Sequence, residues 1–599
     1  MKAVGLIGLG AGVLVVLTGF FMTPDFLATH FDFVGTLDEW KIQQIQLYRR
    51  LAAFIGTLAV VFGALYLICP SRVNRFFAFV SHVGGRGQTR YFYLPFCFIC
   101  FLIALILGLS STQSGPGISA DSTYYIFVGE NLYYGGGFYI PFYDATLTAE
   151  TPLYPLSIAA FMHLGFDAEQ AARLIPILCF ASLMFPLFFL GKITNDVFTG
   201  YVVCLICLVF MRLLWIASYA WTEMLYTFLS VLVILFLTKF AESNEGKNKT
   251  LCVAGLFTAL ACLTRYIGVT LLLVGLIVIV LKNKSRLKKA ASQILLFGSI
   301  SCLPIIPWLY RNIILTSNLQ GFAVVPSEVG LLDNINLTVA TILGGYSVGQ
   351  LSHLYSYAYI GLVPIIVATC FIVIYVKTHS AEKKVWLRYL GKNYVTISYT
   401  LIYLISYIII RSNLFHGVSH RDLCPVYPFL TLVVISFIFY AYSRIEKPSL
   451  KPTLFSIINI SCALFLVFQA SISLHYWQDA KNGLGYNAPF WRNSQAIAWV
   501  ASNVPDDGMV YSSKRDAISF RLKRPARFLP RSGNEREIEE FFEELKNEEN
   551  SFIICFKKNR RAGLLSNSEI REINQKYDVL VVVADFPEAT IWRVRRWQP

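Results

Sequence analysis

Long apolar runs recur along most of this 599-residue chain, and they constrain its fold more than any other feature. Each run of about 18 residues or more can cross a bilayer core about 30 Å thick as a helix. Inside a bilayer the backbone must satisfy its own hydrogen bonds, which favours helices. Charged residues make up only 15% of the chain, against roughly a quarter in soluble domains. The sequence therefore predicts a polytopic α-helical membrane protein.

About thirteen transmembrane helices are predicted. Two long apolar runs each divide into a hairpin, because positive residues flank both ends: Lys192 and Lys239 flank the first, and Lys249 and Lys282 the second. The polar centre of each run, "WTE" or "LTRYIG", then lies on the opposite side. The predicted spans are residues 3–23, 50–69, 92–111, 170–191, 199–218, 222–241, 250–265, 267–282, 292–310, 357–376, 394–411, 424–442 and 453–472.

Lysine and arginine concentrate in alternate loops, which predicts the orientation. Positive residues favour the cytoplasmic side, so the basic loops after the second and eighth spans lie inside, and so does the N-terminus. The loop at 119–156, which contains no lysine or arginine, then lies outside. The net charge of +15 mostly reflects this cytoplasmic bias and gives no argument for nucleic-acid binding.

The residues after 473 change in character. Helical patterns such as "EREIEEFFEELKNEEN" alternate with β-rich runs such as "SFIICF", "DVLVVVADF" and "ATIWRV". This alternation is typical of a small α/β domain. We therefore predict a two-helix N-terminal region with a cytoplasmic loop at 1–91, a membrane core at 92–473 with an outer loop at 112–169, and a soluble extracytoplasmic α/β domain at 474–599.

Ionisable residues near a bilayer are costly to place and are therefore candidates for function. The outer-face acids are Asp121, Glu130, Asp144, Glu150 and Glu223. Asp121 follows the third span and suits either a catalytic base or a helix N-cap at "ADSTYY". Glu150 suits a site or a plain surface position. Glu223 lies at the top of a hairpin, where it suits either a site or an ion pair with Arg212 or Arg265.

Arginines gather at the same predicted face, and a guanidinium matches phosphate oxygens well. Arg265 and Arg311 suit phosphate binding or simple snorkelling at the interface. Arg421 stands beside His420 and His416 in "FHGVSHRDLC", where a zinc site is conceivable but the spacing is not diagnostic. The basic run "SSKRDAISFRLKRPARFLPR" suits lipid phosphates or a solvated surface. No cysteine and histidine spacing typical of a metal site occurs in a polar loop.

The order of these motifs resembles that of the GT-C fold glycosyltransferases. In particular, it resembles the bacterial group similar to protein O-mannosyltransferases and the lipid A aminoarabinose transferase (glycosyltransferase family 39-like). The matching segments span about 92–599: "SADSTYYIFVGENLYYGGGF", "AETPLYPL", "AARLIPILCFASL", "TEMLYTFLSVL", "LTRYIG", "PWLYRN" and "HRDLCPVYPFL". This chain differs in having two extra spans before residue 92. It also has Thr151 where the aminoarabinose transferase has a lysine, and Ser122 rather than a second acid after Asp121.

The resemblance implies roles for individual residues. Asp121 would be the general base and Glu223 a second catalytic acid, while Glu150 would match an acid linked to a divalent metal ion. No other cofactor is implied. The lipid-linked phosphate and the substrate would contact Arg265, Arg311, Arg421, His420 and Tyr154.

The function implied is sugar transfer from a polyprenyl-phosphate-linked donor to an envelope acceptor, which is a lipid, protein or polysaccharide. The reaction would be an inverting single displacement at the outer face of a bacterial inner membrane. Two alternatives stay open: a ligase that moves a whole lipid-linked glycan, and a lipid or sugar transporter. Transporters commonly show internal repeats, and no convincing repeat is found here.

Overall fold

The computed structural model describes residues 93–243, 247–321, 329–346, 385–413, 418–444, 451–548, 550–558, 561 and 563–595. The predicted spans 3–23, 50–69 and 357–376, the region 1–91 and His416 lie outside these ranges. The chain divides into two compact units. The helical unit contains residues 1–108, 177–217 and 222–477. The mixed unit contains 109–176, 218–221 and 478–599. The outer loop therefore belongs to the same unit as the tail.

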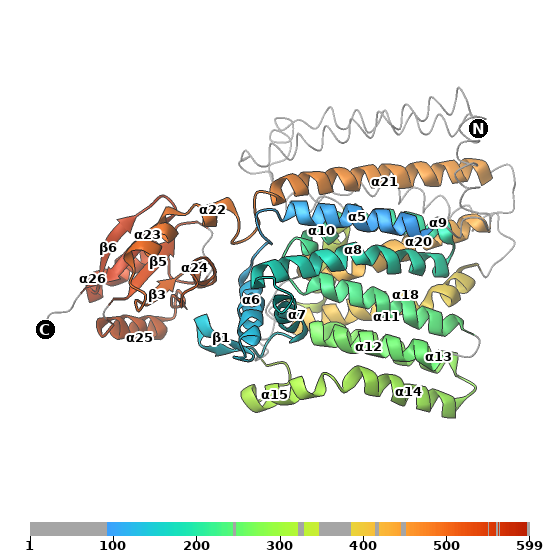
Figure 1. Ribbon diagram of the computed structural model, residues 1–599, viewed down its shortest axis with the longest axis horizontal. Helices are drawn as coiled ribbons and strands as arrows, with labels where there is room; N and C mark the ends of the chain where they lie inside the picture. The colour runs from blue at the N-terminus through green and yellow to red at the C-terminus, as the bar shows by residue number, and fades with distance from the viewer. Residues whose placement is uncertain are drawn as a thin grey trace, which may run out of the picture. The chain divides into compact units, whose positions relative to one another are not determined.

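Long apolar helices make up the described part of the helical unit, and Figure 1 shows many of them running roughly parallel. Helix α11 packs against α12, α12 against α14, and α9 against α20. The elements are α5 (Tyr93–Ser111), α8 (Ala168–Thr194), α9 (Val197–Leu208), α10 (Met211–Ala217), α11 (Glu223–Glu242), α12 (Asn248–Thr264), η4 (Tyr266–Gly268), α13 (Val269–Lys282), α14 (Leu287–Cys302), α15 (Ile306–Thr316), α16 (Leu331–Tyr346), α18 (Val385–Asn413), α19 (His420–Leu423), η5 (Cys424–Val426), α20 (Tyr427–Ser443) and α21 (Lys451–Ala480). Helices α5 and α8 each continue into the mixed unit.

Six helices in the described ranges are long and apolar enough to cross a membrane, and the number rises to eight if each of two bent pairs is one span. These helices confirm a multi-pass α-helical membrane protein, whereas the predicted count of thirteen is not confirmed. The predicted spans 250–265 and 267–282 correspond to α12 and α13, of 17 and 14 residues. At 1.5 Å per residue, each is shorter than a core of about 30 Å.

Two predicted spans are broken rather than straight. Helices α14 and α15 meet at 51°, and α9 and α10 at 58°. The first break contains Pro304, and Pro307 follows near the start of α15. Proline lacks the amide hydrogen that would continue the helical ladder, which explains that bend. No proline lies at the second break, where residues 209–210 separate the two helices.

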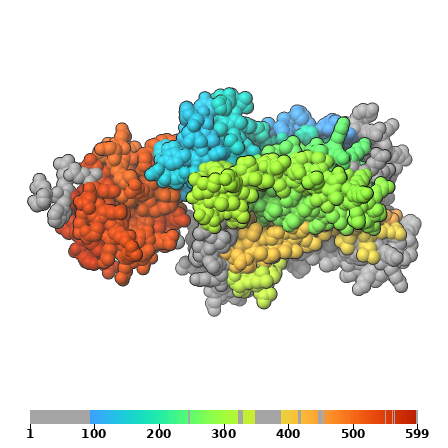
Figure 2. All heavy atoms as spheres, turned by 90° about the horizontal axis from the view of Figure 1, so that it is seen from below, coloured from blue at the N-terminus to red at the C-terminus, as the bar shows by residue number. Residues whose placement is uncertain are grey.

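Helices α13 to α15 present large apolar side chains at the surface, and Figure 2 shows this green part of the helical unit in full view. Leu287 is 77% exposed, Leu295 71% and Tyr310 65%. Exposed apolar area on this scale is unfavourable in water but suits hydrocarbon. The surface therefore agrees with a membrane environment for this unit.

The loop part of the mixed unit begins with α6 (Ala120–Tyr133), followed by a hairpin of β1 (Tyr139–Ile140) and β2 (Ala145–Thr146) around η3 (Pro141–Tyr143). Helix α7 (Leu153–Met162) packs on α6. Short backbone bridges tie three distant segments together. Gly117 pairs with Tyr219, and Ile118 pairs with Gly485 in the tail.

The tail contains a five-stranded sheet in the order β4-β3-β5-β7-β6. Strand β3 runs parallel to β4 and β5, and β7 runs antiparallel to β5 and β6. The predicted α/β domain is thus present. Its elements are α22 (Pro489–Arg492), α23 (Gln495–Asn503), β3 (Val510–Ser512), α24 (Arg515–Leu522), β4 (Arg527–Phe528), α25 (Glu535–Lys546), β5 (Phe552–Phe556), α26 (Asn567–Tyr577), β6 (Leu580–Asp585) and β7 (Ala589–Val594).

Sequence patterns explain the tail helices. Helix α26 starts with a reciprocal capping box between Ser566 and Glu569. Helix α25 buries Phe541, Phe542 and Leu545 in the core beneath the sheet. The basic run around α24 is not the uniformly solvated surface that one interpretation expected, because Ala517 and Ile518 are fully buried.

At Gly485 the backbone of the tail lies close to the backbone of the loop. Its φ is +56°, and a Cβ there would lie 2.0 Å from the carbonyl oxygen of Ile118. We expect Gly485→Ala to destabilise the mixed unit by more than the roughly 1–3 kcal/mol of backbone strain, because the clash adds to it. Thermal unfolding in detergent measures the loss.

Gly533→Ala is the matched control for this substitution. Gly533 also has a positive φ, of +81°, but nothing lies within 4 Å of its Cβ position. Equal losses of stability in the two variants would contradict the close approach at Gly485.

Candidate functional site

A column of buried tyrosines positions the segment that carries the candidate site. Tyr399, Tyr403 and Tyr407 recur every four residues on α18 and therefore share one face of that helix. The hydroxyl of Tyr403 donates to the backbone carbonyl of Asp422 at 2.6 Å, and that of Tyr407 accepts from the amide of Ser419 at 2.9 Å. These bonds hold the short helix α19 against α18.

Glu223 is the centre of an ion-pair cluster in the helical unit. The side chain is fully buried at the start of α11, and its Oε1 accepts from both Arg265 Nη1 and Arg421 Nε, the latter at 2.6 Å. Its Oε2 is buried and has no hydrogen-bond partner among the described residues. The structure therefore confirms the ion pair with Arg265 that the sequence left open, and adds Arg421 to it.

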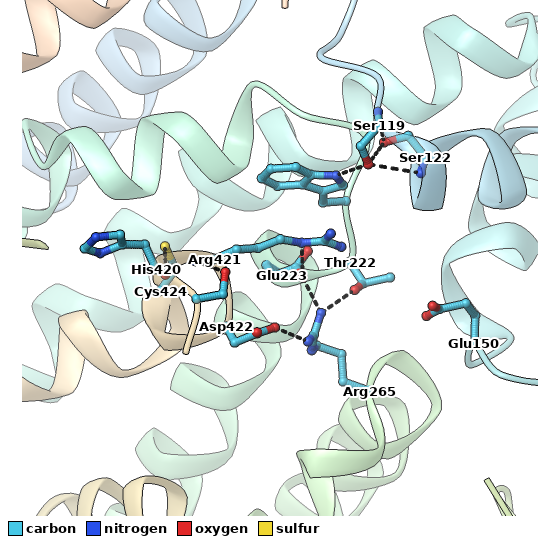
Figure 3. Close-up of polar contacts among 12 residues, drawn as sticks. Ser119, Ser122, Glu150, Thr222, Glu223, Arg265, His420, Arg421, Asp422 and Cys424 are labelled. Carbon is cyan, nitrogen blue, oxygen red and sulfur yellow. Dashed lines mark hydrogen bonds and ion pairs between the residues drawn. The ribbon is translucent and has the colours of Figure 1, made fainter. Parts of the chain in front are cut away.

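Asp422 extends the cluster from α19. Its Oδ1 accepts from Arg265 Nη2 at 2.8 Å, and its Oδ2 pairs with Arg411 Nη2 from the end of α18. Arg265 also donates to Thr222 at 3.1 Å. In Figure 3 the guanidinium of Arg265 is directed at Thr222 and Asp422 together. Arg265 thus joins α11 and α19 to the break after α12, and Asp422 adds the end of α18.

The ion-pair cluster carries more positive than negative charge. Three arginines, Arg265, Arg411 and Arg421, pair with the two carboxylates. The side chains of Arg265 and Arg421 stay 23% and 19% exposed, so an anion in solution can reach them. A partly exposed group of guanidiniums, held by one buried and one partly buried acid, suits phosphate binding.

His420 and Arg212 border this cluster. Arg212 is buried on α10 and stacks on Trp215 with 5.6 Å between the guanidinium carbon and the ring centroid. The Nδ1 atom of His420 is buried without a hydrogen-bond partner among the described residues. His420 begins α19, the segment that also supplies Arg421 and Asp422, and its contact with the substrate stays a prediction.

Two other predicted substrate contacts have different surroundings. Arg311, on α15, stacks on Trp308 at 4.5 Å and donates to Asn312 at 3.3 Å. Tyr154, on α7, is fully buried, and its hydroxyl donates to the carbonyl of Ala172 at 2.8 Å. Its ring packs edge-on against Tyr125. This burial gives Tyr154 a packing role in the mixed unit.

Asp121 lies in the first turn of α6 and does not cap it. Ser119 is the N-cap, in a capping box with Ser122. The alternative interpretation of Asp121 as a cap is therefore wrong. Burial raises the pKa of Tyr124, and the charges of Asp516 and Asp121 raise it further. Asp121 thus lies close enough to Tyr124 to influence its ionisation.

The other loop acids are bound locally. Glu150 accepts a hydrogen bond from Tyr125 at 2.7 Å, and exposed Asp144 accepts one from Tyr139 at 2.5 Å. Within the ranges that the structure describes, no three histidine, cysteine or acidic residues are grouped so as to hold a metal ion. The metal role of Glu150 therefore stays a prediction on which the proposals below do not depend.

Sequence reasoning missed Asp422 as a site residue and did not select Arg411 among the arginines. Asp422 directly follows Arg421 on α19, shortly before the apolar helix α20, and an acid in that position is itself a signal. Arg411 ends the tyrosine face of α18, four residues after Tyr407. The two signals point to a shared site only when α18 and α19 are known to pack together.

One family model matches part of the chain. The family model described as dolichyl-phosphate-mannose-protein mannosyltransferase matches residues 149–310. This segment includes Glu223 and Arg265. A search of curated proteins finds no match.

Solved structures resemble much more of the chain. ArnT from Cupriavidus metallidurans in the apo state has a TM-score of 0.57 at 11% identity, covering 82% of this chain and 97% of that one. The same protein bound to undecaprenyl phosphate gives 0.55 at 11% identity, with 84% and 98% covered. The arabinofuranosyltransferase AftD from Mycobacteria gives 0.51 at 13% identity, covering 84% of this chain and 40% of that one.

This chain has the GT-C glycosyltransferase fold. The resemblance inferred from motif order is thereby confirmed at the level of fold. At 11–13% identity the GT-C match does not carry the chemistry of those proteins over to this one. The chemistry has to be argued from the side chains.

The buried pairing of Glu223 predicts a large effect on stability. Glu223→Gln leaves the guanidiniums of Arg265 and Arg421 without their shared carboxylate, so we expect a loss of about 3–5 kcal/mol. Denaturant or thermal unfolding of the purified protein in detergent measures it. Glu540→Gln removes an exposed i,i+4 pair with Arg536 and should change stability little. A Glu223 variant as stable as the Glu540 variant would overturn the assigned pairing.

Proposed function

We propose that this protein is a membrane glycosyltransferase that moves a sugar from a polyprenyl-phosphate-linked donor to an acceptor of the cell envelope. The arginine-rich ion-pair cluster carries the proposal, because it offers partly exposed guanidiniums beside apolar helices. Support also comes from the GT-C fold and from the undecaprenyl phosphate bound by one similar protein. We place the reaction at the outer face, as the loop charges predict, of a bacterial inner membrane, as the family resemblance implies.

Arg265 and Arg421 are proposed to bind the donor phosphate. Each guanidinium has five N–H donors in a fixed plane, more than its carboxylate partners use. Glu223 and Asp422 hold these planes in position from one side. Binding the phosphate by arginine also stabilises the negative charge that grows on it as the sugar departs.

Glu223 is proposed to position the arginines. Its full burial and its two guanidinium partners hold the carboxylate within the cluster and away from solvent. The catalytic acid role expected for it from the resemblance is untested. A shared carboxylate between two arginines fixes their separation, which is what recognition of a phosphate group requires.

Asp121 is proposed to act as the general base. The acceptor hydroxyl loses its proton to Asp121 as its oxygen attacks the anomeric carbon. The bond from that carbon to the phosphate oxygen breaks, and the polyprenyl phosphate leaves with the electron pair. One displacement inverts the anomeric carbon. Asp121 is partly exposed in the first turn of α6, where an acceptor can reach it.

Loss of a phosphate-binding arginine should affect donor binding most. We expect Arg421→Gln to raise the KM for the polyprenyl-phosphate sugar about 10- to 100-fold, since one charge-assisted contact is removed. Turnover is followed by mass spectrometry of the donor lipid and the glycosylated product. Arg444→Gln, an exposed arginine at the end of α20, is the control. An unchanged KM in Arg421→Gln would exclude the assigned role.

Loss of the base should instead affect the chemical step. We expect Asp121→Asn to lower kcat by about 10²–10⁴-fold with the donor KM little changed. Glu130→Gln, on the same helix, should retain activity and serves as the matched control. Full turnover in the Asp121 variant, at equal expression in membranes, would disprove the assignment.

A further inference from the structure

Three cations gather around the start of α24 in the tail: Lys514, Arg515 and Arg561. The guanidinium carbon of Arg515 lies 4.1 Å from the ring centroid of Phe528, and that of Arg561 lies 4.8 Å from the same ring. Both guanidiniums thus lie against Phe528. Like charges gathered in one cluster repel each other unless opposite charge compensates them.

The described tail supplies only partial compensation. Asp516 is buried, and its Oδ1 lies 3.4 Å from Arg515 Nε. Burial lowers the pKa of Lys514; the charge of Asp516 opposes this shift and the charge of Arg561 adds to it. The pKa of Lys514 therefore depends on the charge of Arg561 as well as on that of Asp516. One buried carboxylate among three cations leaves an excess of positive charge that an anion would stabilise.

Of these cations, Arg515 contacts the helix that carries the proposed base. Arg515 Nη2 donates to the hydroxyl of Tyr124 at 3.1 Å, and its guanidinium lies 4.3 Å from the ring of Tyr143. Tyr124 stands three residues after Asp121 on α6, so the two side chains are neighbours on one face of that helix. All of these residues belong to the mixed unit.

We propose that Lys514, Arg515 and Arg561 form an anion site that binds a phosphate or carboxylate group of the acceptor and holds the acceptor near Asp121. This inference rests on the proposed function and adds a substrate class to it, an acidic acceptor. The tail domain thereby selects the acceptor. Arg515, which also stacks on aromatic rings, positions the site, while exposed Arg561 and partly buried Lys514 contact the anion.

The first test measures binding of inorganic phosphate to the full-length protein in neutral detergent. Arg561→Gln should weaken binding about tenfold, since it removes one charge-assisted contact. Arg536→Gln, an exposed arginine on α25 of the same domain, should leave binding unchanged. Equal affinity in the Arg561 variant and the unmodified protein would overturn the proposal, as would an equal loss in the Arg536 variant.

The arginine cluster of the helical unit can also bind phosphate, so the measurement is repeated in an Arg421→Gln background. An effect of Arg561→Gln that persists there belongs to the tail, and one that disappears contradicts the proposal. Donor turnover is measured in parallel. Phosphate binding that depends on Arg561, in a protein that never consumes a polyprenyl-phosphate sugar, would disprove the proposed function while the anion site stands.

The source of the anion is distinguished by the lipid used. In phosphatidylglycerol nanodiscs, a site that accepts lipid headgroups should bind phosphate more weakly than in phosphatidylcholine nanodiscs, and Arg561→Gln should remove that difference. Equal phosphate affinity in the two lipids assigns the site to a free anionic group instead. Arg561-dependent binding is required in both cases.

Discussion

The buried carboxylate of Glu223, shared by Arg265 and Arg421, is the interaction on which the arrangement of the helical unit's site depends. A charge in an apolar environment is tolerated only when it is paired. Pairing here requires residues from α11, from the break after α12 and from α19 to meet at one point. The tyrosine hydroxyls of α18 form hydrogen bonds with the backbone of residues 419 and 422, and these bonds keep α19 there. Three arginines consequently converge where only two acids balance them.

The mixed unit also contains a cluster with more positive than negative charge, but its arginines are held in place differently. Arginines of the helical cluster are oriented by carboxylates, whereas those at the start of α24 are oriented by stacking on Phe528 and Tyr143. Stacking leaves the N–H donors of a guanidinium in its plane available for hydrogen bonds. The two proposed anion sites would together serve a reaction between a lipid-linked phosphate and a separate, acidic acceptor.

Much of the fold follows from local sequence patterns. Apolar runs predict the membrane helices α5, α8, α11 and α20, and the alternation after residue 473 predicts strands β3, β5, β6 and β7. The patterns were less informative where a helix is bent or short, as at Pro304 and in α12 and α13, because hydropathy reports length and not direction. The N-cap of α6 likewise shows that a local sequence pattern can leave the choice between two residues open. Both Asp121 and Ser119 suit a cap, and only the backbone geometry selects Ser119.

The sequence by itself determined that this chain enters a membrane many times, ends in an α/β domain and carries arginines and acids among apolar residues. Hydropathy and alternation are properties of neighbouring residues, so they can be read without the fold. Only the tertiary structure decided which charges pair: Glu223 with Arg421, 198 residues away, and Arg265 with Asp422, 157 residues away. Such pairs depend on how helices pack, and helix packing depends on side-chain shape across the whole unit.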